Sequence, residues 1–389
     1  MDHPSSNLRG KEMGELYIIE DAYLLVEGGK VSKYGAMIKV PEFNGEVVDC
    51  IGQMITPGLV DSHTHLVFGG SREKETALKL GGASYLDILN MGFGIHSTVK
   101  ATKAMNCLDL SKKAEKVVKT MNSFGVTTIE CKSGYGLDEE TELKQLCAVD
   151  KINTTSTLVK TYLGAHVIPK GKTSTEHLTD CKNFILKHKD KFEFVDIFTE
   201  DSVFNLTESK DYLEFAQANG LKTKIHADEI VALGAAEMAA EIGSASADHL
   251  IATEIAGIKV LAKTDTVCNL LPATSFYLNK PYAKAREMID SGCIVSLSTD
   301  YNPGSSPCEN IQFVMNLALL KYKMTPKEIW NAVTVNAAFN LGVEKGTLKI
   351  GSDADLVVWD CDNFEYPLYH NAVNDALKIY INGILIKEN

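Results

Sequence analysis

The chain has 389 residues, of which 45% are hydrophobic and 23% are charged. This composition is ordinary for a globular protein and argues against a disordered, collagen-like or coiled-coil chain. The 51 acidic residues outnumber the 39 basic ones, which gives a net charge of −12. Such a surplus of negative charge repels nucleic acid and anionic lipid, and no basic stretch compensates for it. We therefore expect neither a nucleic-acid partner nor a membrane partner.

The N-terminal segment 1–15 is polar, and no apolar run approaches the roughly 20 residues needed to cross a bilayer. Nine cysteines are scattered from Cys50 to Cys361 without a C-x-x-C pair. An odd number of dispersed thiols in a chain of this size indicates reduced cysteines, and hence a cytoplasmic protein. A disulfide framework and a structural zinc knuckle are both disfavoured.

Both ends of the chain carry short apolar segments separated by turns. The expected strands are 17–19, 22–27, 30–34 and 46–50 near the start, and 356–359 and 376–386 near the end, the last with a turn at Asn382-Gly383. Neither group could bury a sheet face alone. We expect the two groups to pack together as one small β-sandwich domain, formed by residues 1–55 and 346–389.

Between these ends, residues 56–345 alternate strand-like runs with helical patterns. The eight runs are 54–60, 126–131, 157–163, 194–198, 223–225, 245–247, 266–270 and 294–298, and helical segments between them include 139–152, 211–218, 232–241 and 283–291. Repeating βα units with buried strands predict an α/β fold with a parallel sheet, and eight units predict a closed (β/α)8 barrel. The alternative is an open doubly wound sheet, which normally binds a nucleotide through a glycine-rich first turn. No such turn follows the first run.

Side chains with metal-ligand chemistry follow several of the predicted strands, and the chemistry of a barrel lies at the C-terminal strand ends. The first run ends in Asp61-Ser62-His63-Thr64-His65. Residues i and i+2 of an extended segment project to the same side, so His63 and His65 point into one site. The other polar residues at predicted strand ends include His166, His226, Glu229, His249 and Asp300.

A single buried histidine is more often a hydrogen-bonded core residue than a ligand, but the joint placement of five of the ten histidines favours a metal site. Two histidines at i and i+2, a third from another strand and a late aspartate suit zinc or iron with a water position left open. A bound metal would make that water a usable nucleophile near neutral pH.

Three residues are candidates for the proton transfers that such a water requires. Glu229 lies three residues after His226 and could reach the water or a leaving nitrogen; alternatively it is only a carboxylate at a helix start. His249 is placed to hydrogen-bond an oxygen on which negative charge develops, or else it is a packing histidine. Asp300 could both bind the metal and accept the proton of the water.

Two segments resemble the amidohydrolase superfamily. The sequence PGLVDSHTH at 57–65 is similar to the first-strand signature of that superfamily, and GSDADLVV at 351–358 resembles its return into the β-sandwich. Within the superfamily the chain resembles the imidazolonepropionases over nearly the whole barrel. This resemblance is carried by HLVFGGSRE at 65–73, ECKSGYGL at 130–137, LGAH at 163–166, HADE at 226–229 and DYNPGSSP at 300–307.

The resemblance implies hydrolysis of the cyclic amide of 4-imidazolone-5-propanoate to N-formimidoyl-L-glutamate in histidine degradation, by a metal-activated water. It implies four metal ligands, namely His63, His65, His226 and Asp300. It implies proton transfer by Glu229 and His249, with Asp300 as a further catalytic residue. The substrate-binding residues that it implies are Arg72, Tyr85, Tyr135, His166, Asn302, Gly304 and Ser305.

The propionate of that substrate needs a cation in an acidic protein, and the fork of Arg72 suits a carboxylate. Alternatively, Arg72 forms a surface salt bridge with Glu73 or Glu75, and Tyr85 only packs on a helix. Two-metal hydrolases of this architecture often use a lysine carbamate at the fourth strand, where residues 196–200 contain no lysine, so we expect one metal. Three imidazoles and one carboxylate suit zinc and iron alike.

Two other functions are compatible with a barrel of this kind. A metal-dependent deaminase of a heterocyclic base would need the same ligands, but a neutral base would not need Arg72. A binding barrel without catalysis would normally have lost one or more ligands, and every ligand is present here. A homodimer is the default expectation for a soluble enzyme.

Overall fold

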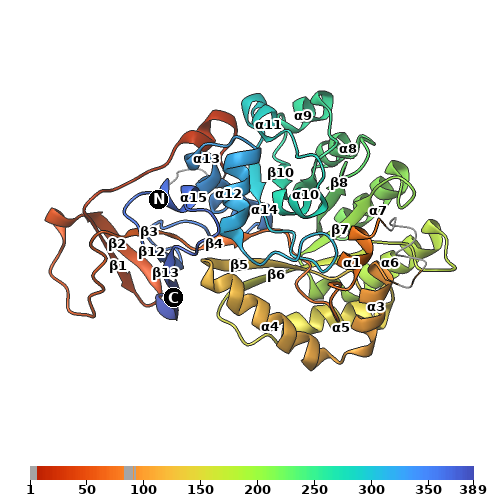
Figure 1. Ribbon diagram of the computed structural model, residues 1–389, viewed down its shortest axis with the longest axis horizontal. Coiled ribbons are helices and arrows are strands. Elements are labelled where there is room, and N and C mark those ends of the chain that lie inside the picture. Colours follow the sequence, from red (N-terminus) through yellow and green to blue (C-terminus); the bar gives the residue numbers. More distant parts are fainter. Residues whose placement is uncertain (1–6, 83–90, 92) are drawn as a thin grey trace.

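The computed structural model describes residues 7–82, 91 and 93–389. Its centre is an eight-stranded sheet in which every neighbouring pair of strands is parallel (Figure 1). In order along the sheet, the strands are β4 (Leu59–Asp61), β5 (Val126–Lys132), β6 (Thr157–Ala165), β7 (Phe194–Thr199), β8 (Lys222–Ala227), β9 (Ser246–His249), β10 (Val267–Leu270) and β11 (Val295–Leu297). Most of their residues are buried, as expected for strands covered on both faces.

The first and last strands of this sheet are joined just beyond their C-terminal ends. The Asp300 N–H donates to the His63 carbonyl at 3.1 Å, and the His65 N–H donates to the Tyr301 carbonyl at 2.9 Å. These bonds close the sheet into a barrel, which confirms the predicted (β/α)8 fold. They also lie among the polar residues expected to form the site.

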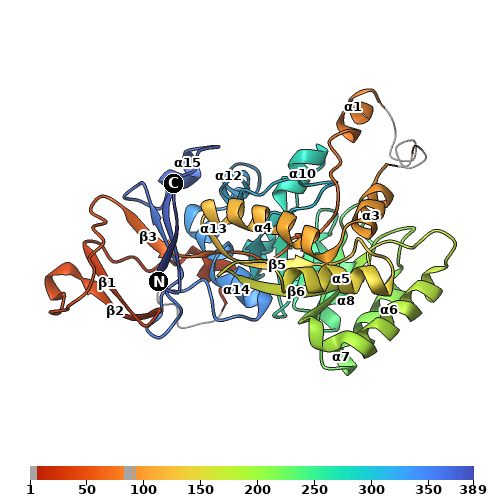
Figure 2. The same cartoon turned by 90° about the horizontal axis from the view of Figure 1, so that it is seen from below.

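Helices lie around the outside of the barrel, and Figure 2 shows α4 and α5 beside strands β5 and β6. Several begin at a side-chain cap, as α6 does where Thr173 and Glu176 form a capping box. The helices are α1 (Glu75–Leu80), α3 (Ile95–Ala104), α4 (Cys107–Ser123), α5 (Glu139–Val149), α6 (Ser174–His188), α7 (Leu206–Ala218), α8 (Ala235–Glu241), α9 (Ile255–Leu261), α10 (Pro272–Leu278), α11 (Ala285–Ser291), α12 (Ile311–Lys321), α13 (Pro326–Ala332), α14 (Val335–Leu341) and α15 (Tyr366–Tyr369). Short 3₁₀ helices are η1 (Gly10–Gly14), η2 (Met37–Lys39) and η3 (Lys189–Lys191).

The two ends of the chain meet beside the barrel, where red and dark blue segments lie together in Figure 1. Strands β1 (Ala22–Glu27) and β2 (Lys30–Ala36) pair antiparallel. A second antiparallel sheet has the order β14 (Ile384–Glu388), β13 (Ala376–Ile381), β12 (Leu356–Trp359) and β3 (Met54–Pro57). Leu24, Val31 and Tyr34 of the first sheet pack against Ile55, Leu356 and Tyr380 of the second, so both ends share one small core.

Three strand predictions were wrong. Segments 17–19 and 46–50 form no strand; Tyr17 is 57% and Val47 70% exposed, so these apolar residues have no sheet face to cover. The run 54–60 is two strands, β3 in the antiparallel sheet and β4 in the barrel. The chain passes between them at Gly58, where an added Cβ would lie 2.2 Å from Thr127 Oγ1. The domain boundaries predicted at 55/56 and 345/346 stay predictions.

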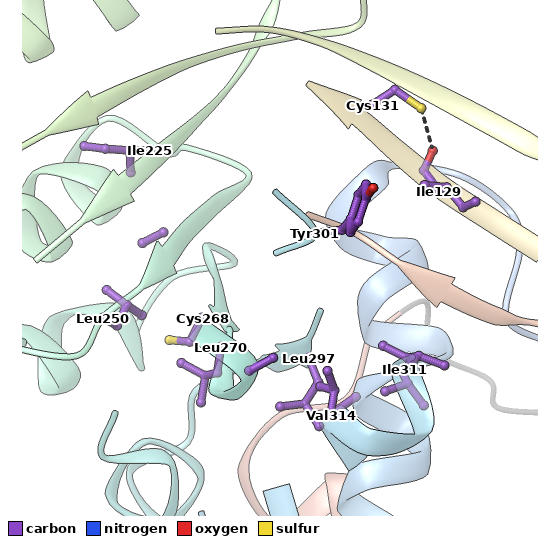
Figure 3. Packing of buried hydrophobic residues seen from close by; sticks show 14 of the residues in the cluster. Ile129, Cys131, Ile225, Leu250, Cys268, Leu270, Leu297, Tyr301, Ile311 and Val314 are labelled. Carbon is purple, nitrogen blue, oxygen red and sulfur yellow. Dashed lines mark hydrogen bonds between the residues drawn. The ribbon is translucent and has the colours of Figure 1, made fainter. Parts of the chain in front are cut away.

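Apolar side chains from several strands pack together with those of α12 in one hydrophobic core (Figure 3). Ile129 on β5, Ile225 on β8 and Leu270 on β10 are fully buried, as are Ile311 and Val314 on α12. A close-packed interior of this kind holds the strand ends, and the polar residues on them, in fixed positions. Over the described part of the chain, no helix combines the length and the apolar character that crossing a membrane requires.

Candidate metal centre and active site

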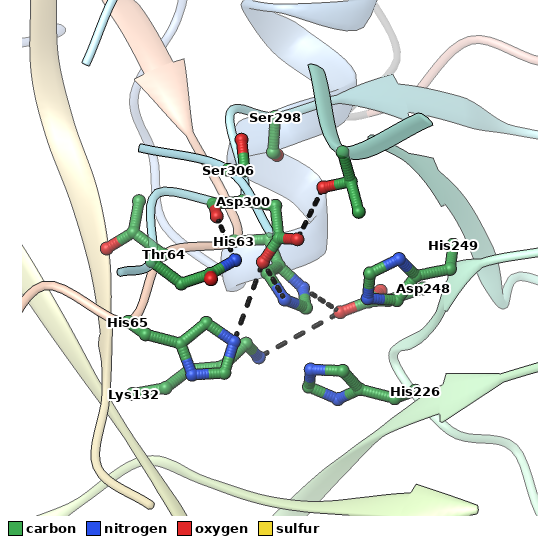
Figure 4. Close-up of polar contacts among 12 residues, drawn as sticks. His63, Thr64, His65, Lys132, His226, Asp248, His249, Ser298, Asp300 and Ser306 are labelled. Carbon is green, nitrogen blue, oxygen red and sulfur yellow. Dashed lines mark hydrogen bonds and ion pairs between the residues drawn. The ribbon is translucent and has the colours of Figure 1, made fainter. Parts of the chain in front are cut away.

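Five residues with metal-ligand chemistry converge at the C-terminal end of the barrel (Figure 4). His63 and His65 follow β4, His226 lies in β8, His249 ends β9 and Asp300 follows β11. Each of them is 3% exposed or less. The imidazole centroids of His63 and His226 are 4.7 Å apart, and those of His63 and His65 are 5.4 Å apart. Strands from different parts of the chain therefore bring these side chains to one place.

Their donor atoms fit a cation. One nitrogen each from His63, His65 and His226 lie within 4.8 Å of one another, and the same holds for donor atoms of His63, His249 and Asp300. The carboxylate oxygen Oδ1 of Asp300 lies 3.4 Å from Nε2 of His63 and 3.6 Å from Nε2 of His65.

Three of these atoms are buried and have no hydrogen-bond partner within the described residues. They are Nε2 of His63, Nε2 of His226 and Oδ1 of Asp300. Buried polar atoms are rarely left unpaired. Imidazole nitrogen and carboxylate oxygen are ligands that zinc and iron accept, so this set fits a single metal ion.

A second layer of carboxylates orients two of the imidazoles. Asp248 Oδ2 lies 2.6 Å from Nδ1 of His63, and Asp196 Oδ2 lies 3.1 Å from Nδ1 of His226. Such contacts fix the ring so that Nε2 carries the lone pair. Sequence reasoning missed both roles. The available signal was an aspartate inside an otherwise apolar buried strand, which is plain for Asp196 in β7.

Burial controls the charge of the site. It lowers the pKa of His63 and of His65 well below the ordinary value, so both are neutral imidazoles, which is the form that binds metal. Burial also lowers the pKa of His249 to about 3. For His226, burial acts in the same direction, but the neighbouring Asp196 carboxylate outweighs it and raises the pKa.

The backbone at the strand ends is itself unusual. His249 has φ of 75° and Asp300 has φ of 54°, both in the left-handed region that side chains other than glycine rarely adopt. Backbone strain of this kind tends to gather at functional sites, where the surrounding structure enforces it. Both side chains lie close to His63: the His249 ring centroid is 5.5 Å from that of His63, and Asp300 Oδ1 is 3.4 Å from Nε2 of His63.

The two residues expected to move protons lie beside each other. Glu229 Oε2 is 3.8 Å from Nε2 of His249, and the Glu229 side chain is 17% exposed. Burial raises the pKa of Glu229, a shift that brings a carboxyl closer to the pH at which it can exchange protons. The Nδ1 atom of His249 is buried and unpaired among the described residues, so this ring too has a free donor or acceptor.

Tyr135 and His166 form one wall of the site. The His166 ring stacks on His65 with centroids 5.2 Å apart, and the Tyr135 ring lies 5.3 Å from His166. Nδ1 of His166 contacts the Gly134 carbonyl at 3.0 Å. Among the residues that the structure describes, Nε2 of His166 has no hydrogen-bond partner, so it is available to a ligand.

Arg72 lies within the fold and is paired with Glu75, one of the two partners considered from the sequence. The guanidinium donates to both carboxylate oxygens of Glu75 at 2.9 and 2.8 Å, and Glu75 is only 1% exposed. The same carboxylate accepts the Gly94 N–H at 2.7 Å. A Cβ at Gly304 would lie 2.1 Å from Nη1 of Arg72. The structure therefore brings Arg72 and Gly304 together, although they are far apart in the sequence.

The loop after β11 is shaped by Asn302. Its Oδ1 accepts the N–H groups of Gly304 and Ser305, both at 2.8 Å, and its Nδ2 donates to the Asp300 carbonyl at 2.7 Å. Asn302 thus fixes the turn that places Gly304 beside Arg72. Tyr85, the remaining residue expected to bind substrate, lies outside the described residues.

Comparison with known proteins gives three findings. The model of a family described as "Amidohydrolase family" matches residues 54–384. The chain is 49% identical over 398 residues to the imidazolonepropionases of Bacillus mycoides (strain KBAB4) and Bacillus thuringiensis (strain Al Hakam), covering 98% of this chain and 93% of each relative. Among solved structures, the 5-methylcytosine deaminase of Klebsiella pneumoniae liganded with phosphonocytosine superposes with a TM-score of 0.73 at 17% identity, over 94% of both chains. At that identity the last likeness bears on the fold alone.

Proposed function

Because the chain belongs to the amidohydrolase family and, within it, to the imidazolonepropionases, we propose that it hydrolyses the ring amide of 4-imidazolone-5-propanoate to N-formimidoyl-L-glutamate. This reaction belongs to histidine degradation. The observation that carries the proposal is the convergence of buried, unpaired His and Asp donor atoms. The guanidinium of Arg72 on the adjoining loop supplies the cation that a propionate needs.

His63, His65, His226 and Asp300 would hold one zinc or iron ion. Such an ion supplies Lewis acidity, which polarises a carbonyl oxygen and makes a water nucleophile available near neutral pH. The fixed orientation of His63 by Asp248, and of His226 by Asp196, directs Nε2 of each ring into the site before any ion binds.

Arg72 would bind the propionate of the substrate. Glu75 accepts from Nε and Nη2 on one edge of the guanidinium. Within the described residues Nη1 donates to no acceptor, so this nitrogen would be available to a second carboxylate. Gly304 packs against Nη1 without a side chain that would cover it. Tyr135 and His166, which lie beside His65, would contact the imidazolone ring.

Glu229 and His249 would serve the proton transfers. Glu229 takes the proton of the attacking water at its carboxylate and passes it to the departing ring nitrogen. Neutral His249 donates a hydrogen bond to the carbonyl oxygen as negative charge develops there. Asp300 lies close to the His63 and His65 nitrogens and is a second acceptor for the same proton.

A spectroscopic assay on purified protein tests the reaction. We expect loss of the imidazolone chromophore together with about one metal ion per chain, measured by elemental analysis. Ammonia release from cytosine or guanine in place of imidazolone turnover would identify a deaminase and contradict the proposal. Folded protein that holds no metal and consumes no imidazolone would indicate a binding barrel.

The variant Glu229→Gln tests the proton carrier. It keeps the size of the side chain but cannot accept a proton, so we expect kcat to fall about a hundredfold or more with metal content unchanged. Glu287→Gln, an exposed residue on α11, is the control and should keep full activity. An unchanged rate in Glu229→Gln would remove this residue from the mechanism.

We also propose that the enzyme acts in the cytoplasm as a homodimer. All nine cysteines are unpaired in the structure, which supports a reducing compartment. The dimer rests on the general preference of soluble enzymes for two-fold assemblies. Light scattering on the purified protein tests it, and a monomeric mass would contradict it.

A further inference from the structure

A cluster of fully buried charges lies directly beneath the candidate ligands, and the mechanism proposed above does not use it. At its centre is Lys132, the last residue of β5, whose side chain is completely inaccessible. Its ammonium nitrogen lies 2.8 Å from Asp196, 3.0 Å from Glu130 and 3.8 Å from Asp248. Figure 4 shows this side chain beneath His63 and His65, with its ammonium toward Asp248.

Two of the three carboxylates around Lys132 also contact candidate ligands. Asp248 holds Nδ1 of His63 at 2.6 Å, and Asp196 holds Nδ1 of His226 at 3.1 Å. These histidines come from strands β4 and β8, which do not pair with each other in the sheet. Lys132 is therefore a single cation shared by the supports of two imidazoles from separate strands.

The charge on Lys132 needs an explanation, because a buried ammonium is strongly unfavourable unless it is closely paired with anions. Burial opposes its charge, but the carboxylates of Asp196, Glu130 and Asp248 outweigh burial and raise its pKa. A positive charge so near a cation site repels the cation. By charge alone, Lys132 would therefore weaken metal binding.

We propose that Lys132 is a positioning residue: its ammonium fixes the carboxylates of Asp196 and Asp248, and through them orients His226 and His63 toward the metal. The inference rests on the proposed metal site. Without the ammonium, three buried carboxylates would face one another and the two aspartates would turn away from the histidines. Orientation of the two histidines by Lys132 then increases metal affinity by more than the repulsion between Lys132 and the ion decreases it.

Lys224 provides a matched control within the same barrel. It is equally buried on β8, and its ammonium lies 3.1 Å from Glu130 and 3.2 Å from the Ser62 carbonyl. Among the described residues it forms no ion pair with Asp196 or Asp248. Lys224→Met therefore removes a buried charge but none of the ion pairs that hold Asp196 and Asp248.

The experiment compares Lys132→Met, Lys224→Met and the unchanged protein. Zn²⁺ affinity is measured by competition with a chromophoric chelator, and ligand geometry by the visible absorption of the Co²⁺-substituted proteins. We expect Lys132→Met to bind Zn²⁺ about 10- to 100-fold more weakly, with an altered Co²⁺ spectrum. Lys224→Met should stay within about threefold of the unchanged protein, with the same spectrum.

Either of two results in the metal-binding comparison would overturn the positioning role. One is Lys132→Met binding Zn²⁺ as tightly as the unchanged protein or more tightly, as pure charge repulsion predicts. The other is an equal loss in Lys224→Met, which would indicate a general effect of removing a buried charge. If Lys132→Met does not fold, Lys132→Gln takes its place with the same expected weakening, and failure of both to fold would assign Lys132 a purely structural role.

The readouts also separate this inference from the proposed function. If the unchanged protein binds no Zn²⁺, the metal site itself is wrong, whatever the variants do. If the unchanged protein binds Zn²⁺ and turns over imidazolone while Lys132→Met does the same with equal affinity, only the positioning role fails. Lys132→Arg, which restores the charge, should bind Zn²⁺ more tightly than Lys132→Met, and no recovery would count against the proposal.

Discussion

At the scale of single residues, the contact between Arg72 and Gly304 shows how the substrate side of the site is built. Arg72 is held on one edge by buried Glu75, and its Nη1 lies where a side chain at position 304 would begin. The loop after β11 can approach the guanidinium only because Gly304 has no Cβ. The position of the Arg72 guanidinium is thus set by the ion pair with Glu75 on one side and by the backbone of Gly304 on the other.

Gly304→Ala tests this packing. Its Cβ would start 2.1 Å from Nη1 of Arg72, so the guanidinium must move, and displacement of a binding group by about 1 Å is costly. We expect KM for the imidazolone substrate to rise about tenfold or more, with a smaller change in kcat. Gly45→Ala is the control, because no atom lies within 4 Å of a Cβ there. Equal KM values for the two variants would show that Arg72 does not hold the propionate.

The sequence predicts some of these residues and not others, for a physical reason. The spacing of His63 and His65 alone places both on one side of an extended segment. The contacts of Lys132 with Asp196 and Asp248 depend on which residues of β5, β7 and β9 meet inside the closed barrel. That register is set by the packing of the whole sheet, so local pattern cannot indicate it.

At the scale of elements, the first turn of α5 holds the loop that carries Tyr135. The buried carboxylate of Glu142 accepts the N–H groups of Gly134, Gly136 and Leu137 at 2.9, 2.7 and 2.8 Å. Three backbone donors that would otherwise be unpaired are satisfied by one side chain. The helix thereby fixes the loop as well as packing on the barrel.

Glu142→Gln tests this link between helix and loop. The amide keeps one acceptor oxygen for Gly136 and Leu137, but its NH₂ group then faces the Gly134 N–H, so one donor loses its acceptor. We expect a loss of about 2–3 kcal/mol in the free energy of unfolding, and a higher KM as Tyr135 shifts. Urea denaturation and steady-state kinetics measure both. The exposed neighbour Glu140→Gln should change stability by less than about 0.5 kcal/mol, and a similar small effect in Glu142→Gln would contradict the role.

Most strands were predictable from local pattern, but the run 54–60 was not predicted correctly. An apolar run reveals that its residues are buried, but not in which sheet. Strand β3 pairs antiparallel with β12, while β4 pairs parallel with β5, yet both begin with two apolar residues. The division at Gly58 follows from the close approach of Thr127, a contact 69 positions away that no local window contains.

At the scale of the whole molecule, one charged cluster joins the two ends of the chain. Lys345, just after α14, donates to Asp353 and Asp355 at 2.8 Å each, and Lys30 of β2 also pairs with Asp353. Asp355 in turn accepts the N–H of Asn382, in the turn between β13 and β14, at 3.0 Å. The cluster therefore links the N-terminal sheet, the exit from the barrel and the C-terminal sheet.

Lys345→Met should destabilise the fold by about 2 kcal/mol at neutral pH, since it removes a charged donor from two carboxylates. Burial lowers the pKa of Lys345, but its hydrogen bonds to these carboxylates outweigh burial and raise it. The contribution of Lys345 to the free energy of unfolding is therefore complete below the pKa of about 10.4 that lysine has in the unfolded chain. It is lost as the pH rises through the higher pKa of Lys345 in the folded protein. Lys30 and then Lys345 lower the pKa of Asp353. The contribution of Asp353 to the free energy of unfolding is therefore lost as the pH falls below about 4 and through the lowered pKa of this carboxyl in the folded protein.

The difference in unfolding free energy between Lys345→Met and the unchanged protein should therefore be constant from about pH 5 to 9 and should shrink at both extremes. Urea denaturation over a series of pH values measures it, with the exposed Lys387→Met of β14 as control. The control should differ from the unchanged protein by less than about 0.5 kcal/mol at every pH. A difference for Lys345→Met that stays the same in acid, at neutral pH and in alkali would mean that lost packing of the side chain, and not lost charge pairing, weakens the junction between the chain ends.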